Sequence, residues 1–347
     1  LPAALGLLAA APAHAAGSFE FCDKPAEFSA GEKDVLLRFA AVVRDTLDAS
    51  GRDVALVARS GLDLRRLDER YSHEGVLLRS DDGRAWRVRQ LYYVCDEHRP
   101  RVFEEGLAGF TMGTEDAGTG WLSLVLLPPG AAAAALRRTA LDKAHDIGVL
   151  GASYSANAYP FSTMFQNCNQ WVMELLADAW APREATPAEP PAESDNTSPA
   201  MPAASASASA SASASASASA SASAETAATA SGTPADAAPL RARAQRWLRA
   251  QGYLPTVFTV HPRLMTLLPD VMPYLSNADH PPEEIAHGRY NVSMPESVET
   301  FVHAKIPGAE RIELCHAGPR VVVHRGWDDI ADGCVPGPGD RVIDLAG

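Results

Sequence analysis

Residues 164–180, MFQNCNQWVMELLADAW, indicate a helix around which the rest of the chain is organised. From Trp171 onward almost every position is apolar, and only Glu174 and Asp178 mark a polar stripe at helical spacing. A helix with this pattern is expected to lie inside a protein. Pro182 is expected to end it, because proline cannot continue the hydrogen bonding of a helix.

The start of this helix carries a cysteine. Asn167 and Asn169 are residues of the kind that cap helix N-termini, so Cys168 is expected at or just before the first turn. Free backbone N–H groups and the helix dipole favour an anion there, and they lower a thiol pKa from about 8.5 to roughly 3.5–7.5. Cys168 is therefore a candidate nucleophile, and the alternative is a buried, inert thiol.

The composition describes an acidic globular protein. With 347 residues, 46% of them hydrophobic, the chain is long enough to bury a substantial core. The formal net charge of -13 argues against a nucleic-acid partner and against adhesion to anionic membrane surfaces, since both require clustered lysine and arginine.

The first residues indicate export. Residues 1–16 are apolar and rich in alanine, and the sequence AHAAG at 13–17 fits a signal-peptide cleavage site, so we interpret 1–16 as the remnant of a secretory signal peptide. The protein is expected to be exported to the periplasm. This run is too short to cross a membrane and no later apolar run is long enough, so we expect no membrane span in the mature protein.

Five cysteines in an exported protein predict disulfides and at least one free thiol. Cys315 and Cys334 flank a short apolar strand and are candidates for one disulfide, and Cys22 and Cys95 are candidates for a second. Cys168 is then free by elimination, although sequence alone does not fix the connectivity.

Composition divides the chain into parts. After the signal remnant, residues 17–181 are expected to form an α+β core. Residues 182–239 consist largely of Pro, Ser, Thr, Ala and Glu, with an unbroken Ser-Ala repeat at 205–224, and are expected to be a disordered linker because they have no apolar face to bury. Residues 240–347 are expected to form a C-terminal α+β segment packed on the core.

Periodicity predicts the elements around the central helix. Ser29 and Glu32 form a capping box before a helix over 34–50. Residues 71–79 and 86–94 form a hairpin whose turn contains the sequence DDG. Further predicted elements are strands over 53–59, 121–127 and 253–260, a short helix over 103–107, helices over 131–147 and 240–251, a helix opened by a second capping box at 293–296, and a hairpin of 311–316 with 320–325.

The first hairpin supplies partners for the thiol. His73 shares a strand face with Gly75, which leaves room for a helix, and Gln90 lies on the returning strand. A thiol hydrolase needs an imidazole beside the sulfur and a polar group that orients the imidazole. His73 and Gln90 are the candidates for these two roles.

Other polar residues complete the candidate site. The helix-start N–H groups, together with the side chains of Asn167, Gln166 or Asn169, are candidates for an oxyanion hole. Arg59 is a candidate for binding a substrate carboxylate, with an ordinary salt bridge as the alternative. We expect no metal site, because the sequence has no H-x-x-x-H or C-x-x-C pair, and no cofactor, because it has no Walker loop or dinucleotide fingerprint.

These motifs resemble known families. CNQWVMELL at 168–176 is similar to the Cys-Ser-Gly-aromatic-Val helix opening of NlpC-type papain-like amidases, and DVALVARSG at 53–61 with YSHEGV at 71–76 resembles their strand, loop and His-x-Gly strand. The histidine precedes the cysteine, as in the circularly permuted branch that includes lecithin retinol acyltransferase. Nearly all of the mature chain outside the Ser-Ala repeat resembles the uncharacterised bacterial family called domain of unknown function 2145.

The resemblance implies a permuted papain-like α+β fold, in which an antiparallel sheet packs on a central Cys-bearing helix. It implies Cys168 as nucleophile and His73 as base and acid, while Gln90 departs from the His or acid that relatives often carry at the third position. We therefore expect an exported thiol hydrolase that cleaves a cell-wall peptide or another acyl or amide substrate. The alternative is a non-catalytic envelope protein that serves binding or assembly on the same fold.

Overall fold

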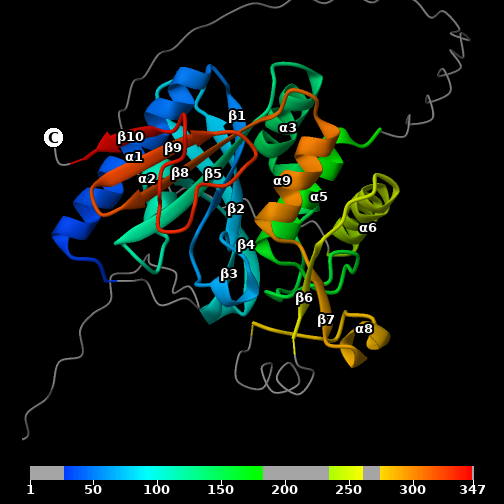
Figure 1. The fold of residues 1–347 in the computed structure, drawn as a ribbon. Coiled ribbons are helices and arrows are strands. Elements are labelled where there is room, and N and C mark those ends of the chain that lie inside the picture. Colours follow the sequence, from blue (N-terminus) through cyan, green and yellow to red (C-terminus); the bar gives the residue numbers. More distant parts are fainter. Residues whose placement is uncertain (1–26, 183–233, 261–273, 346–347) are drawn as a thin grey trace, which may run out of the picture. The chain divides into compact units, whose positions relative to one another are not determined.

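The structure is a computed structural model that describes residues 27–182, 234–260 and 274–345. An eight-stranded antiparallel sheet organises this part of the chain, with strand order β10-β9-β8-β5-β1-β2-β3-β4 (Figure 1). The expected α+β class with a large antiparallel sheet is confirmed. The strands are β1 (Val54–Arg59), β2 (His73–Arg79), β3 (Trp86–Val94), β4 (Arg99–Gly106), β5 (Thr119–Leu126), β8 (Glu310–Ala317), β9 (Arg320–Arg325) and β10 (Arg341–Asp344).

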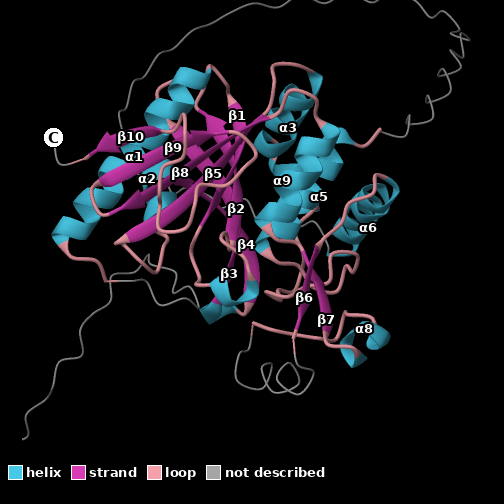
Figure 2. Cartoon of the chain, viewed as in Figure 1, coloured by secondary structure: helices cyan, strands magenta, loops and turns pink. Residues whose placement is uncertain are grey.

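Helices cover both faces of the sheet (Figure 2). On one face, α1 (Ala30–Ser50) and α2 (Leu107–Met112) pack over a core that includes Val57 and Leu77. The opposite face, with Leu56 and Val76, carries a second core. Its helices are α3 (Ala131–Leu141), α5 (Cys168–Trp180), α6 (Pro234–Ala250) and α9 (Pro295–Lys305).

Several predicted elements are confirmed. In the capping box of α1, the Ser29 hydroxyl accepts from the Glu32 N–H at 3.3 Å and the Glu32 carboxylate accepts from the Ser29 N–H at 2.7 Å. The predicted hairpins correspond to β2 with β3 and β8 with β9. Cys315 and Cys334 form a disulfide, and Cys95 is disulfide-bonded. Its predicted partner Cys22 lies outside the described residues, as does the signal remnant 1–16.

Four predictions are wrong in detail. Residues 103–107 belong to β4 and the start of α2, because the segment pairs along all of β3. The helix predicted over 131–147 breaks at Asp142, whose side chain caps α4 (Lys143–Gly148) by accepting from the Ala144 N–H at 2.9 Å.

The predicted linker 182–239 extends too far, since α6 begins at Pro234, and residues 183–233 lie outside the described part. At α9 the cap is Met294, whose N–H donates to the Ser297 hydroxyl at 3.1 Å, and not a Ser293–Glu296 box.

The central helix α5 begins three residues before Trp171, at Cys168. Asn167 is its N-cap, and its side-chain oxygen accepts from the Gln170 N–H at 2.7 Å. The thiol-bearing residue therefore occupies the first helical position, at the end of α5 that reaches β2. There the Asn169 side chain donates to the Ser72 carbonyl at 3.4 Å, directly before His73.

The polar stripe of α5 is buried against α6. Glu174 has no exposed side-chain surface, and its carboxylate accepts from Arg241 Nε at 2.7 Å and from Gln245 Nε2 at 2.7 Å. Gln166 and Gln170 donate to the same carboxylate at 2.6 Å and 3.0 Å. This network holds α6 against α5, although residues 183–233 separate the two helices in the sequence.

A smaller two-stranded sheet pairs β6 (Thr256–Thr259) with β7 (Arg289–Val292), next to the short helix α8 (Pro282–Ala286). In the part of the chain that is described, no helix has both the length and the apolar character needed to cross a membrane.

The Glu174 network gives a stability prediction. Arg241→Ala leaves a buried carboxylate without its cation, so the free energy of unfolding should fall by about 3–5 kcal/mol. Arg246→Ala, an exposed arginine on the same helix, should change it by less than about 0.5 kcal/mol. Urea unfolding followed by circular dichroism measures both, and equal losses for the two variants would contradict this account of how α6 docks.

Candidate active site

A chain of buried side chains orients His73. Its Nε2 atom lies 2.7 Å from the Gln90 side-chain oxygen, and the Gln90 amide nitrogen donates to the Glu105 carboxylate. Because the Gln90 amide nitrogen donates to Glu105, the Gln90 oxygen is the end of the amide that faces His73. His73 Nε2 therefore carries the hydrogen and Nδ1 carries a lone pair. This arrangement is the one that a catalytic histidine needs in order to accept a proton.

The surroundings keep His73 neutral. The imidazole is 7% exposed, stacks on Tyr92 with ring centroids 4.7 Å apart, and lies 6.1 Å from the Phe110 ring of α2. Burial and, to a lesser extent, the positive charge of Arg59 lower the pKa of His73 to about 3, and the hydrogen bond that His73 donates to the Gln90 oxygen opposes both effects.

Arg59 is a buried cation beside this histidine. It lies directly opposite His73 on the neighbouring strand, donates to the Tyr92 hydroxyl at 3.1 Å, and stacks 5.2 Å from the Phe110 ring centroid. Among the described residues no carboxylate forms a salt bridge with Arg59, and its Nε atom has no hydrogen-bond partner. A buried guanidinium without a carboxylate is available to an anionic group of a ligand.

Two glycines make room for this guanidinium. A Cβ atom at Gly61 would lie 2.6 Å from Arg59 Nη1, and one at Gly113 would lie 2.6 Å from Arg59 Nη2. Neither position accepts a side chain while Arg59 keeps its place. Glycine at these two positions therefore allows the backbone to pass close to the Arg59 guanidinium.

Cys168 is the free cysteine of the described chain, as predicted. The predicted pKa depression is not found: burial raises the pKa of the Cys168 thiol to about 12, while the backbone N–H of Asn169 and the charge of Arg59 pull it down less strongly. The side chain is 7% exposed, and its sulfur donates to the Asn169 side-chain oxygen at 3.5 Å. Loss of solvation thus outweighs the helix N-terminus.

Cys168 and His73 both lie near the start of β2, where the Asn169 side chain meets the residue before His73. His73 contacts Phe110 on the α2 face, whereas Cys168 belongs to the core under α5. Arg59 lies close enough to both to lower the pKa of each. Within the described residues no hydrogen bond joins the thiol to the imidazole, so their action as a pair stays a prediction.

The side-chain amides predicted for an oxyanion hole have other partners. Gln166 donates to the Val149 carbonyl at 2.8 Å and to Glu174, which uses both amide hydrogens. Asn167 and Asn169 both donate to the Ser293 carbonyl, at 3.3 Å and 3.2 Å.

The remaining candidates for an oxyanion hole are the backbone N–H groups at the start of α5. The backbone N–H groups of Asn169 and Cys168 lower the pKa of the Cys168 thiol. They are the donors that stand beside the nucleophilic atom, as an oxyanion hole requires.

The sequence analysis missed two residues that surround His73 and Gln90, namely Tyr92 and Glu105. Tyr92 follows Gln90 at strand spacing and shares its face, which was the available signal. Glu105 was missed because its segment was taken for a short helix, and its contact with Gln90 appears only when β4 is paired with β3. No group of three or more His, Cys, Asp or Glu residues in the described ranges is placed to hold a metal ion.

The fold and the site define an α+β protein with a buried thiol at a helix start and an oriented, buried histidine on the adjoining strand. A family model described as "Uncharacterized protein conserved in bacteria (DUF2145)" matches residues 46–199 and 208–302, and this protein belongs to that family. The chain matches no curated protein and no solved structure.

The low pKa of His73 predicts a specific pH dependence of stability. Between the unfolded pKa of about 6.5 and the folded pKa of about 3, the unfolded chain binds a proton that the folded chain does not. His73 should therefore make the free energy of unfolding fall by about 1.4 kcal/mol for each pH unit of acidification in this window. Urea unfolding at several pH values between about 4 and 6 measures this slope.

Comparing variants isolates the histidine from the carboxylates that titrate in the same range. His73→Gln should flatten the slope by about one proton, whereas His287→Gln, at an exposed histidine on the protein surface, should leave it unchanged. Identical slopes for the wild type and His73→Gln would show that His73 is not buried in its neutral form.

Proposed function

We propose that this protein is a thiol hydrolase that cleaves an amide bond, with Cys168 as nucleophile and His73 as base and acid. The observation that carries the proposal is the hydrogen-bond chain from His73 through Gln90 to Glu105, which leaves the Nδ1 lone pair of His73 as the proton acceptor. Gln90 is the orienting residue. The resemblance to circularly permuted NlpC-type amidases supports the same assignment.

The reaction follows acyl-transfer chemistry. The Cys168 sulfur attacks the substrate carbonyl carbon while its proton passes to His73 Nδ1, and the backbone N–H groups of Cys168 and Asn169 bind the oxyanion. The tetrahedral intermediate then expels the amine, which takes the proton from His73. Water, deprotonated by His73, attacks the resulting thioester, releases the carboxylic acid and restores the thiol.

The resting state is neutral in this mechanism. With a thiol pKa of about 12 and an imidazole pKa of about 3, proton transfer is unfavourable before the substrate binds. Substrate binding must change the solvation of both groups, so that the thiolate forms only in the complex. The unoccupied protein should consequently react slowly with thiol reagents.

Arg59 supports a substrate with a carboxylate. It is a buried cation without a carboxylate partner in the described chain, and it lies opposite His73. A free carboxylate on a peptide would match it in charge and geometry. With the expected export to the periplasm, this favours cell-wall peptides as the substrate class.

The second candidate is a non-catalytic binding protein of the bacterial envelope. It is favoured by one observation, the raised pKa of a thiol that has no hydrogen bond to the imidazole in the described chain. Such a protein would retain peptide binding at Arg59 and would not turn the peptide over.

An acyl-adduct experiment tests the hydrolase. Soluble peptide fragments released from bacterial cell walls are incubated with the protein, and intact mass and peptide mapping follow Cys168. We expect a transient acyl adduct on Cys168 and cleavage of the peptide. His73→Ala should slow cleavage by about 10²–10⁴-fold, because it removes the general base.

His287→Ala serves as the matched control. It removes an exposed histidine from the segment that connects α8 to β7, and it should leave the rate unchanged. Cleavage that persists in Cys168→Ala would refute the proposed nucleophile. Binding without cleavage, equal in the wild type and in Cys168→Ala, would favour the binding protein.

A further inference from the structure

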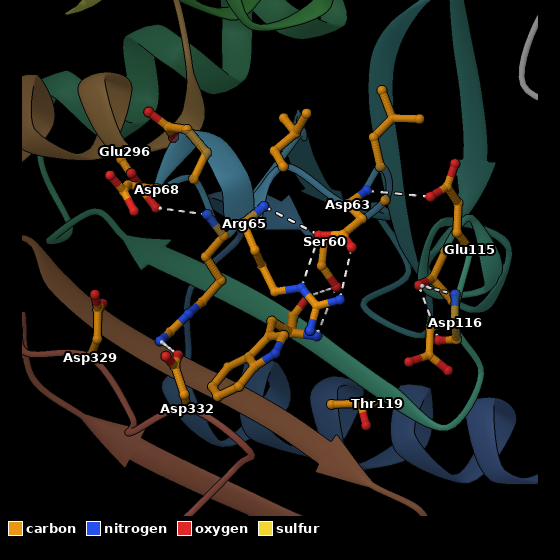
Figure 3. Close-up of a pocket in the computed structure, with 17 residues that line it drawn as sticks. Ser60, Asp63, Arg65, Asp68, Glu115, Asp116, Thr119, Glu296, Asp329 and Asp332 are labelled. Carbon is orange, nitrogen blue, oxygen red and sulfur yellow. Dashed lines mark hydrogen bonds and ion pairs between the residues drawn. The ribbon is translucent and has the colours of Figure 1, made fainter. Parts of the chain in front are cut away.

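An acidic cavity lies apart from the thiol. It measures about 530 Å³ and is lined by the loop after β1, the loop before β5, Glu296 of α9 and residues after β9. Neither Cys168 nor His73 lines it. In Figure 3, Asp68 and Glu296 stand on one side of the cavity and Glu115 and Asp116 on the other.

The charge of this cavity is unbalanced. Eight of its lining residues are Asp or Glu and two are Arg. Both arginines are already paired, Arg65 with Asp63 at 2.8 Å and Arg70 with Glu313 and Asp332 at 2.9 Å each. Asp329 is paired as well, with Arg311 at 2.8 Å. The other five carboxylates have no salt bridge to a described residue, which gives the cavity a negative potential.

Glu69 marks the binding position within the cavity. Its side chain is only 4% exposed, it lines the cavity, and its Oε2 atom receives no hydrogen bond from the described residues. The groups that face it are the Glu296 carboxyl of α9, the Thr256 hydroxyl of β6 and Asp68 of its own loop. A buried carboxylate without a donor is costly, and a cationic ligand would supply one.

The Glu69 carboxyl forms a hydrogen bond with the Glu296 carboxyl. Burial is the main cause that raises the pKa of Glu69 to about 9, and the hydrogen bond to Glu296 and the negative charge of Glu296 act in the same direction. A positive charge beside the two carboxyl groups would favour the ionised form of Glu69.

The shape and chemistry of the lining favour an organic cation over a metal ion. Trp121 forms an aromatic wall on which the Arg70 guanidinium already stacks, 4.1 Å from the ring centroid. Over the described residues no three acidic or other ligating side chains converge closely enough for a metal. A planar guanidinium, by contrast, can donate to two carboxyl groups at once.

We propose that this cavity binds a small organic cation with a guanidinium or ammonium head group, which pairs with the carboxylates of Glu69 and Glu296. The site acts independently of the thiol chemistry. On binding, Glu69 releases its proton to solvent and both carboxylates accept N–H donors from the ligand.

Calorimetry with ethylguanidinium chloride tests this proposal on the full chain. Guanidinium remains charged at all relevant pH values, so any proton exchanged comes from the protein. Titrations at about pH 7 in two buffers of different ionisation enthalpy should show release of about one proton per ligand bound. Between about pH 6 and 8 the Kd should fall by about tenfold per pH unit, and the neutral isostere ethylurea should not bind.

Variants assign the site. Glu296→Gln should weaken ethylguanidinium binding by at least about tenfold, whereas Glu283→Gln, an exposed carboxylate of α8 outside the cavity, should bind as the wild type does. Circular dichroism verifies that the variants fold, and the pH dependence of the wild type tests the proposal without them. Absence of binding, binding without proton release, or binding of calcium chloride in place of ethylguanidinium would overturn it.

Discussion

The buried carboxylate of Glu174 is the interaction on which the arrangement of α5 depends. Unpaired, such a charge would cost several kcal/mol, so its burial requires Arg241 and the surrounding amides to be in place. Arg241 belongs to α6, which follows residues 183–233 in the sequence, and Gln166 lies just before the start of α5. One carboxylate thus joins α6 to α5 and fixes the chain that leads into Cys168.

The candidate site shows a competition between burial and local charge. A helix N-terminus favours a thiolate, but at Cys168 the loss of solvation is the larger effect and the thiol stays protonated. At His73 burial and the Arg59 charge act in the same direction, so the imidazole is neutral as well. Both groups are therefore uncharged in the structure, and in the proposed hydrolase a substrate carboxylate bound at Arg59 would change the charge that acts on them.

Much of this organisation is readable in the sequence, and the missing parts have physical causes. The apolar periodicity of α5 and the turn between β2 and β3 are local signals, and the elements they predict are confirmed. The pairing of Gln90 with His73 followed from strand alternation. Glu105 and the raised thiol pKa could not be predicted, because both depend on which distant segments cover the site, and local patterns carry no information on that.

The central claim is that the thiol of Cys168 and the imidazole of His73 act on the same substrate. Treatment with 1,3-dibromoacetone tests it most directly, since this reagent alkylates a thiol and then bridges to an imidazole nitrogen only when the two are adjacent. The account predicts a cross-linked peptide pair containing Cys168 and His73, lost in His73→Gln. Modification of Cys168 by a single, unbridged adduct in the folded wild type would contradict it.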